Sequence, residues 1–313
     1  MVTCKIKSEL EDDTFQPNHM HLHMEGGQLN HTILNVIRRT LLEEVPSLAF
    51  DKEDISIVKN TSVYNNDFMR NRIENMPIVN ISNGKFNFDE YNNLKYDASV
   101  NSEDESKLTI FCKKKNDTSN IINVTTDDIT FYDNNSKIDN IYKNRILIVK
   151  LKPGEEIEFS AKSKLSLGKF NSIYSSVGIC CYEILNDNNF ILKFESCGQY
   201  TNRYLLKNVC KIIIHRLNII KDKMKDLKFN EDSNSGKFII DNEDHTLGSL
   251  IAYGLQDHKN IEVAGFMLDN LLLKNLEISY LTNSGKPINS IVIDVINIYI
   301  KTFNIIDKIF ESI

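Results

Sequence analysis

One stretch of sequence occurs twice in this chain, in two versions that keep the same order of residue types. Residues 30–41 read NHTILNVIRRTL, and residues 244–255 read DHTLGSLIAYGL. The positions identical in both copies are His31 and His245, Thr32 and Thr246, Ile37 and Ile251, and Leu41 and Leu255. Each copy begins with Asn or Asp, which favours a helix start because the side chain accepts a hydrogen bond from a free backbone N–H. The chain is therefore expected to contain two related units.

Each copy of the repeat is followed by strands and then by a long amphipathic helix. Apolar residues recur at helical spacing over residues 204–227 and 288–313. Strand patterns precede these helices at 190–196 in the first unit, and at 261–267 and 273–282 in the second. Apolar helices of two such units are buried best against each other. The sequence therefore predicts an α+β fold in which two dimerisation units, each with strands and two long helices, pair within one chain.

The repeat helices should lie at the centre of this pairing. A long apolar stripe exposed to water is rarely tolerated, so neither unit is expected to be stable alone. The residues predicted to form the core of the intramolecular pair are Ile33, Val36, Ile37, Leu247, Leu250 and Ile251.

A long segment lies inside the first unit. Pro46 ends the first helix, because proline has no backbone N–H and restricts the residue before it. The pattern then becomes short, β-rich and hydrophilic, which indicates an inserted domain, and a stretch rich in Asn, Asp, Ser and Gly separates the two units. The expected division is 1–47 with 184–228 for the first unit, 48–183 for the inserted domain, 229–236 for the linker and 237–313 for the second unit.

Composition excludes several classes of function. The 313-residue chain has a net charge of −6 and scattered basic residues, whereas a protein that grips nucleic acid needs clustered Lys and Arg. No run approaches the roughly 18 apolar residues of a membrane span. Because the first residues also lack the apolar core of a signal peptide, we expect an intracellular protein without membrane contact. Six cysteines without a C-x2-C pair predict neither disulfides nor a zinc site.

Three histidines, His19, His21 and His23, alternate along a predicted strand and would share one of its faces. Such a row could bind a metal ion, so a metal-dependent hydrolase is the enzymatic alternative. Metal ligands usually converge from separate elements, which makes histidines on a surface strand the simpler interpretation. The sequence has no glycine-rich phosphate loop, G-x-S-x-G elbow, H-E-x-x-H helix or cluster of Mg²⁺-binding carboxylates. We therefore expect no catalytic residue and no cofactor.

Five segments of the first unit and the inserted domain follow a family pattern in order. They are NVIRRTLLEEVP at 35–46, ISIVKNTSV at 55–63, NDFMRNRIENMP at 66–77, VKLKPGEEI at 149–157 and FESCG at 194–198. These segments resemble the alpha-type assembly subunits of multisubunit DNA-directed RNA polymerases: the bacterial alpha subunit, the archaeal D subunit and the third-largest subunit of eukaryotic polymerase II. In the second unit, NEDHTLGSL at 242–250 and AGF at 264–266 resemble the small partner of that subunit, the archaeal L subunit.

The chain departs from the family pattern at three places. Cys112 stands alone near the centre of the inserted domain, so the zinc loop and the iron–sulfur site of some relatives are not expected here. The sequence NSIYSS at 171–176 replaces the family's HAKWSP, and Asp269 and Asn270 replace the small partner's His-Pro pair. The contacts that relatives make at these places are therefore not carried over.

The resemblance implies a non-catalytic assembly platform of a DNA-dependent RNA polymerase, with both partners fused in one polypeptide. The implied partners are the largest and second-largest polymerase subunits and a small subunit of the platform, while DNA and RNA are reached only through the complex. The residues expected to dock the large subunits are Arg38, Arg39, Asn60, Thr61, Ser62, Asp67 and Arg72. For the two arginines late in the first helix, a solvated charge pair is the alternative.

The fusion and the abundance of Asn, Ile and Lys are similar to polymerase subunits of large cytoplasmic DNA viruses. That similarity implies transcription in the host cytoplasm, in viral factories, and packaging in the virion. A stand-alone scaffolding protein made of two helical units is the non-enzymatic alternative. The N-T-S and K-P-G-E-E-I segments distinguish the two interpretations, because helix packing alone gives no reason to expect them.

Overall fold

In the computed structural model, the two copies of the repeated sequence belong to two units that have the same order of strands and helices. In the first unit, β2 (Asn18–Glu25) leads into α1 (His31–Glu43), which carries the first copy of the repeat. The hairpin of β10 (Val177–Asn186) and β11 (Asn189–Ser196) then leads into the long helix α4 (Asn202–Asp226).

The second unit follows the same order of elements without an insertion. Strand β12 (Ser235–Asp241) leads into α5 (His245–Gln256), which carries the second copy of the repeat. The strands β13 (Ile261–Leu268) and β14 (Asn275–Thr282) lead into the long helix α6 (Ile288–Ser312). In each unit the repeat helix is therefore short and the final helix is long.

The sheets of the two units also pair in the same order. The first runs β2–β11–β10 and the second runs β12–β14–β13, with the central strand antiparallel to both neighbours. The first sheet has one further edge strand, β1 (Thr3–Leu10), beside β2. The predicted α+β class is confirmed. The structure describes residues 2–10, 18–79, 87–96, 108–134, 136–226, 234–268, 275–283 and 286–312.

Both repeat helices begin at the predicted N-cap residues. The side chain of Asn30 accepts a hydrogen bond from the Ile33 N–H at 2.9 Å, and that of Asp244 accepts one from the Thr246 N–H at 2.8 Å. Each bond satisfies one of the N–H groups that a helix start leaves without an intrahelical acceptor. The prediction of two N-caps at matching positions is confirmed.

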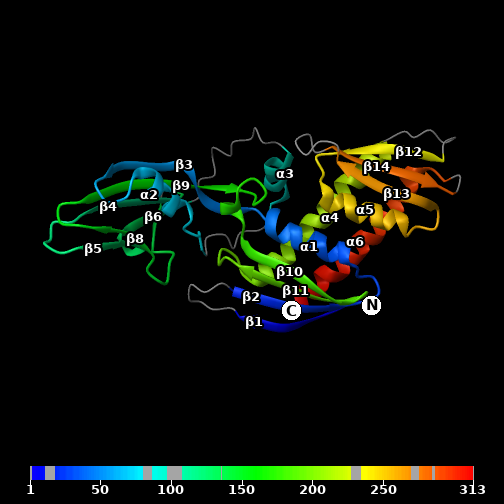
Figure 1. Ribbon diagram of the computed structural model, residues 1–313, viewed down its shortest axis with the longest axis horizontal. Helices are drawn as coiled ribbons and strands as arrows, with labels where there is room; N and C mark the ends of the chain where they lie inside the picture. Colours follow the sequence, from blue (N-terminus) through cyan, green and yellow to red (C-terminus); the bar gives the residue numbers. More distant parts are fainter. Residues whose placement is uncertain are drawn as a thin grey trace.

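The helices join the two units. Helix α4 packs along α6, and α1 lies against α5 (Figure 1). We call this junction the seam. Apolar side chains of these four helices and of both sheets form one continuous buried cluster. Gly248 lets α5 approach its own sheet, because a Cβ at this position would lie only 2.6 Å from Cδ1 of Leu276.

Helix α6 is the one helix of the described residues that is long and apolar enough to cross a membrane by length and composition. Its apolar residues, among them Val292, Ile296 and Phe303, are buried in the cluster at the seam. Packing inside the protein therefore accounts for the apolar character of this helix.

The segment inserted in the first unit forms sheets of its own, which extend to one end of the molecule (Figure 1). A five-stranded sheet has the order β3 (Ser47–Asn60), β9 (Glu156–Ser166), β4 (Leu108–Lys115), β6 (Ile129–Asp133) and β7 (Ser136–Ile138). Its buried side chains belong to a second cluster, separate from that at the seam.

Smaller elements complete the insertion. The strands β5 (Ile122–Thr125) and β8 (Leu147–Leu151) pair with each other, and the 3-10 helix η1 (Thr126–Asp128) follows β5. Helix α2 (Asn66–Glu74) contacts β3. The 3-10 helix η2 (Ser172–Tyr174) also contacts β3, just before the chain returns to the first unit.

Two features differ from the expected division of the chain. Strand β10 already pairs with β11 from Val177, whereas the return to the first unit was expected at residue 184. As an edge strand, β10 exposes most of its residues, including the apolar Ile179 and Ile184, so its sequence lacks the regular alternation that would have placed it in the first unit. Helix α3 (Phe88–Tyr96) lies within the expected insertion, yet Tyr91 belongs to the cluster at the seam.

The boundary between the two units also differs slightly from the expected one. Strand β12 begins at Ser235, inside the expected linker 229–236. Residues 227–233, and the pair Asp269 and Asn270, lie outside the described residues.

Candidate docking surfaces and the ion cluster at the seam

The N-T-S segment forms a hydrogen-bonded turn at the end of β3. The side-chain amide of Asn60 donates to the Tyr64 carbonyl at 2.8 Å, and its oxygen accepts from the Ser62 N–H at 3.1 Å. Thr61 bonds to the neighbouring strand, because its hydroxyl accepts from the Glu156 N–H at 2.8 Å. These three side chains hold the turn, so their polar groups are largely used within the chain.

Arg72 and Asp67 lie on helix α2, which follows the turn. The guanidinium of Arg72 donates to the carbonyls of Leu147 and Ile148, both at 2.9 Å, and so ties α2 to β8. Asp67 is exposed in the first turn of the helix, where its carboxylate pairs with Arg70 at 3.4 Å. Of these predicted docking residues, Asp67 is the more accessible and Arg72 is structural.

Beside this turn, four apolar side chains are exposed, which the sequence prediction did not include. They are Val58, Val63, Tyr64 and Phe68, and we call them the tip patch. The rings of Tyr64 and Phe68 stack with centroids 4.5 Å apart, and the side chain of Val63 is 66% exposed. Several exposed apolar side chains near one turn are typical of a protein interaction site.

Arg38 and Arg39 are half-buried on α1. Arg38 donates to the Asn35 side chain at 2.9 and 3.1 Å on its own helix. Arg39 pairs with Glu43 at 3.2 Å and reaches Asp244 of the second unit at 3.9 Å. Arg39 therefore contributes to the contact between the units, which the sequence prediction did not foresee.

The six residues predicted for the core of the pair all lie in the buried cluster at the seam. None is more than 1% exposed. The structure brings them together with apolar residues of α4 and α6, including Ile213, Leu217 and Phe303.

A group of buried charges, which we call the seam ion cluster, also lies between the units. Its members are Glu44, Tyr91, Lys95, Arg216, Glu243 and Asp244. The side chain of Arg216, on α4, is only 1% exposed. Its guanidinium pairs with Glu243 of the second unit, and with Glu44 of the first at 3.6 Å. One buried cation thus bridges carboxylates from both units.

Helix α3 completes the cluster. Tyr91 donates its hydroxyl proton to Glu44 at 2.8 Å, and Lys95 pairs with Glu243 at 3.1 Å. A segment of the inserted sequence therefore contacts both units at once.

Electrostatics hold the buried carboxylates in their charged form. Burial alone would raise the pKa of Glu44, but Arg216, Lys95 and Lys169 outweigh it and lower that pKa to about 2. The pKa of Glu243 is lowered in the same way, against its burial, by Arg216 and Lys95. Burial raises the pKa of Tyr91 well above its ordinary value, so its hydroxyl keeps the proton that it donates. The buried carboxylates therefore stay ionised because cations lie beside them in a site of low dielectric constant.

Three of these residues stand in motifs that the sequence analysis quoted, Glu44 in NVIRRTLLEEVP, and Glu243 and Asp244 in NEDHTLGSL. Each of them lies next to a helix end, beside an apolar run of the sequence. A charged residue at such a place is the sequence signal that could have indicated a buried charge. Their partner Arg216 is a charged residue on the apolar face of α4, and such a residue signals a buried ion pair.

The three histidines lie along one face of β2, as predicted, opposite the buried Met20, Leu22 and Met24. The rings of His19 and His21 are 5.5 Å apart, and His23 is hydrogen-bonded to Asn189 at 2.6 Å. Side chains in a row on a single strand do not converge on one point. Within the described ranges, no group of three or more His, Cys, Asp or Glu residues has a geometry that could hold a metal ion.

All six cysteines carry free thiols. Cys112 is buried in the cluster of the inserted domain, where burial raises the pKa of its thiol to about 12. The thiol therefore stays protonated and packs as a small apolar group.

Comparison with known families gives two matches on this chain. The family described as the RNA polymerase Rpb3/Rpb11 dimerisation domain matches residues 27–217, and a second model of the same description matches residues 235–308. The first match contains α1, the insertion and α4 as far as residue 217, and the second contains β12, α5 and most of α6. The two matches therefore follow the two units of the structure.

Several polymerase subunits are similar to the chain. The putative DNA directed RNA polymerase subunit R470 of Acanthamoeba polyphaga mimivirus is 27% identical over 294 residues, which cover 85% of this chain and 82% of that protein. Subunit Rpo3 of Methanobrevibacter smithii is 27% identical over 179 residues, covering 56% and 60%. The subunit rpac1 of RNA polymerases I and III of Dictyostelium discoideum is 27% identical over 165 residues, covering 49% and 46%.

Proposed function

Because this chain belongs to the RNA polymerase Rpb3/Rpb11 dimerisation-domain family, as an alpha-like subunit from a large DNA virus, we propose that it is the non-catalytic assembly platform of a viral DNA-directed RNA polymerase. The observation that carries the proposal is the pairing of two units with the same order of strands and helices, each matched by a model of that family, through one buried cluster. In this proposal, the fused chain takes the place of two separate subunits. A covalent link keeps the two halves at a high effective concentration.

We propose that the partners are the largest and second-largest polymerase subunits, together with a small subunit of the platform. The inserted domain would supply the docking surface, because the turn of Asn60, Thr61 and Ser62 holds the exposed tip patch in place. Arg38 on α1 would provide a second contact with a partner subunit. Arg39 would contribute partly by stabilising the seam, because it also reaches Asp244 of the second unit. The division of the chain into two units and an insertion belongs to the same proposal.

A co-purification experiment tests this proposal. The tagged chain would be co-expressed with the two largest polymerase subunits of the same virus, and we expect a stable complex. The double variant Arg38→Ala, Arg39→Ala should remain folded by circular dichroism but lose the second-largest subunit. The control is Arg203→Ala with Lys207→Ala, which removes two exposed cations of α4 and should leave the complex intact. Normal recovery with the first double variant would contradict the role of these arginines.

Catalysis and location can be tested separately. The isolated chain should not extend a primed RNA on a template, because in this proposal the catalytic carboxylates belong to the largest subunit. We also propose that the protein works inside the host cell, in viral factories, and is packaged in the virion. Mass spectrometry of purified virions should then detect it with the large subunits, and its absence there would contradict packaging.

A further inference from the structure

The pairing of the two units creates two crevices built from corresponding elements. The first lies between the C-terminal end of α1, the N-terminal end of α5, and α4. Helix α3 fills it: Tyr91 is fully buried there, and Lys95 reaches Glu243 of the second unit at 3.1 Å. A further bond joins Asn92 to His215 of α4 at 2.7 Å.

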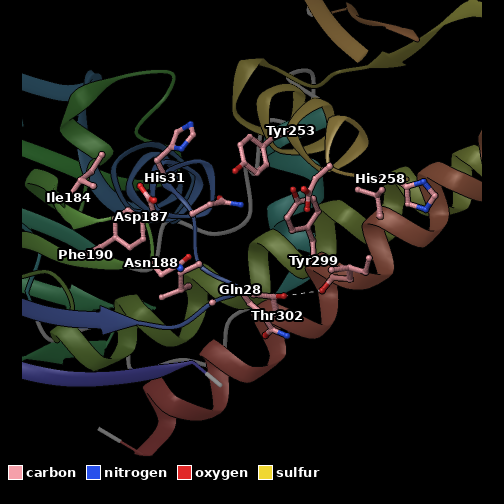
Figure 2. Close-up of a pocket in the computed structure, with 17 residues that line it drawn as sticks. Gln28, His31, Ile184, Asp187, Asn188, Phe190, Tyr253, His258, Tyr299 and Thr302 are labelled. Carbon is pink, nitrogen blue, oxygen red and sulfur yellow. Dashed lines mark hydrogen bonds between the residues drawn. The ribbon is translucent and has the colours of Figure 1, made fainter. Parts of the chain in front are cut away.

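The second crevice lies between the N-terminal end of α1, the C-terminal end of α5, and α6. Figure 2 shows side chains of these helices and of the β10–β11 turn converging on a cavity of about 600 Å³. Its lining includes His31, Asn188, Tyr253, His258, Tyr299 and Thr302. Both units contribute, so the cavity exists only when the units are paired.

The two crevices correspond under exchange of the units. The alignment of the two repeat copies places Arg39 at Tyr253, Glu43 at Asp257 and Glu44 at His258. Exchanging α1 with α5, and α4 with α6, therefore converts the crevice that holds α3 into the crevice of Figure 2. Within the described ranges, no helix lies over the second crevice as α3 lies over the first.

Apolar groups line the second crevice and continue onto its rim. Ile298 of α6 is 57% exposed, and Ile184 of β10 is 59% exposed, although both contribute to the cavity wall. Tyr299 is 94% buried at the wall, and its hydroxyl has no hydrogen-bond partner among the described residues. Gly254 makes room for this ring, because a Cβ there would lie 2.7 Å from the Tyr299 hydroxyl oxygen.

The charges of the second crevice favour a cationic group. Asp257 and Asp187 both line it, and neither has an ion-pair partner among the described residues. Asp257 is the C-cap of α5, where the helix dipole adds further negative potential. In the first crevice, the buried Lys95 of α3 meets a carboxylate of the other unit.

We propose that the second crevice binds an amphipathic helix of a partner protein that carries an aromatic residue and, four positions later, a basic residue. Helix α3 is the template, since Tyr91 and Lys95 have this spacing and lie on one helix face. By the offset between the repeat copies, Glu44 beside Tyr91 corresponds to His258, and Glu243 beside Lys95 corresponds to Leu29. The aromatic ring therefore enters the cavity beside Tyr299 and His258, and the basic group lies at the Leu29 end, where the β10–β11 turn presents Asp187. This is recognition of a helix in a groove. The partner binds the paired form of the chain and no other.

A peptide-binding assay with the full chain tests the inference. The probe is a fluorescein-labelled peptide of about 14 residues with a lactam bridge, since an isolated helix of this length is marginal in water. It carries Tyr and Lys four positions apart, and binding is measured by fluorescence anisotropy. We expect saturable binding, and a peptide with Ala in place of Tyr should bind about tenfold more weakly, because an anchoring aromatic dominates such contacts.

Variants of the chain locate the site. Ile298→Lys should weaken binding about tenfold, because it places a charge at the apolar wall. Ile239→Lys is the control, since Ile239 is similarly exposed but lies on β12 outside the cavity. Asp187→Lys should weaken binding of the Lys peptide about fivefold, within the range of exposed ion pairs. A peptide with Glu in place of Lys should bind this variant more tightly than it binds the natural chain.

Several results would overturn the inference. They are an absence of saturable binding, an equal loss of affinity with Ile239→Lys, or an effect of Asp187→Lys that does not depend on the peptide's charge. Light scattering adds one more: a homodimer of the chain that Ile298→Lys abolishes would identify the occupant as a second copy. The assay contains no large polymerase subunit, so its failure would be distinct from a failure of the proposed function.

Discussion

The seam and the tip of the inserted domain place apolar and charged side chains in opposite ways. At the seam, apolar residues are fully buried, and even Arg216 and Glu243 are removed from water, with partners supplied by the chain itself. At the tip, polar side chains are used to hold a turn, while Val63 and Phe68 face solvent. The buried core of the seam therefore has its partners within this chain, whereas the tip leaves apolar side chains exposed to solvent. Stability should depend on the seam, and docking on the tip.

The largest effect should follow a charge placed in the apolar part of the seam. Ile37→Asp would bury a carboxylate without a partner, at an effective cost of several kcal/mol against a total stability of roughly 5–15 kcal/mol. We expect an unfolded or aggregated chain by circular dichroism and size-exclusion chromatography. Ile239→Asp, at an exposed position of β12, should fold normally. An unchanged urea midpoint for Ile37→Asp would show that the seam does not determine the stability of the chain.

The next effect should follow loss of the buried cation. Arg216→Met leaves Glu44 and Glu243 buried with reduced compensation, which should lower the free energy of unfolding by about 3–5 kcal/mol. The matched control is Lys207→Met on the same helix, whose exposed ion pair with Glu311 should contribute less than about 1 kcal/mol. Urea denaturation measures the free energy of unfolding of both variants. Equal losses in the two variants would show that the buried ion pairs of Arg216 stabilise the chain no more than an exposed one does.

Acid should weaken the seam in a defined pH range. The pKa of Glu44 is lowered to about 2 in the folded chain, whereas the group titrates near its ordinary value of 4.5 when unfolded. A carboxylate with a lowered pKa contributes stability that is present above 4.5 and lost as the pH falls towards 2. Glu44 alone should therefore remove about 1.4 kcal/mol per pH unit in this range.

Urea denaturation at several pH values would measure this loss. Glu44→Gln should flatten the dependence between pH 4.5 and 2. A profile of the natural chain that is already flat in this range would contradict the role of the seam ion cluster.

The smallest effect on stability should be at the tip patch, where the effect on docking should be large. Val63→Ser changes an exposed side chain and should alter the free energy of unfolding by less than about 0.5 kcal/mol. The same variant should reduce recovery of the large polymerase subunits in co-purification. Val263→Ser, at a 58% exposed position of β13, is the control for loss of an exposed valine. Equal recovery with both variants would mean that the tip patch does not dock a partner.

Much of the seam could be predicted from the sequence, because helical periodicity reports which face of a helix is buried. Ile33, Val36 and Ile37 were identified in this way, as were the N-caps Asn30 and Asp244. Periodicity does not report which charged residues meet. Lys95 and Glu243 are 148 positions apart in the chain, and no local pattern connects them.

The tip illustrates the other limit of sequence reasoning. Asn60, Thr61, Ser62 and Arg72 were predicted as contacts to partners, but the structure uses their polar groups to hold the turn and to tie α2 to β8. A motif marks a place in the fold and does not say whether its residues make the contact or support it. Tyr64 in the turn and Phe68 in α2 could not be recognised as exposed, because large apolar residues are expected to be buried.

The separation of the two buried clusters has a consequence for synthesis on the ribosome. The cluster of the inserted domain uses residues from Leu48 to Leu165, so all of its parts have been made before α4 is translated. The cluster at the seam extends from Val2 to Phe310 and cannot close until almost the whole chain has emerged. Domains generally fold as units while translation proceeds. The inserted domain should therefore fold first, while the apolar faces of α1 and α4 remain exposed. Until α6 has been synthesised, these exposed faces should make the nascent chain a substrate for chaperones.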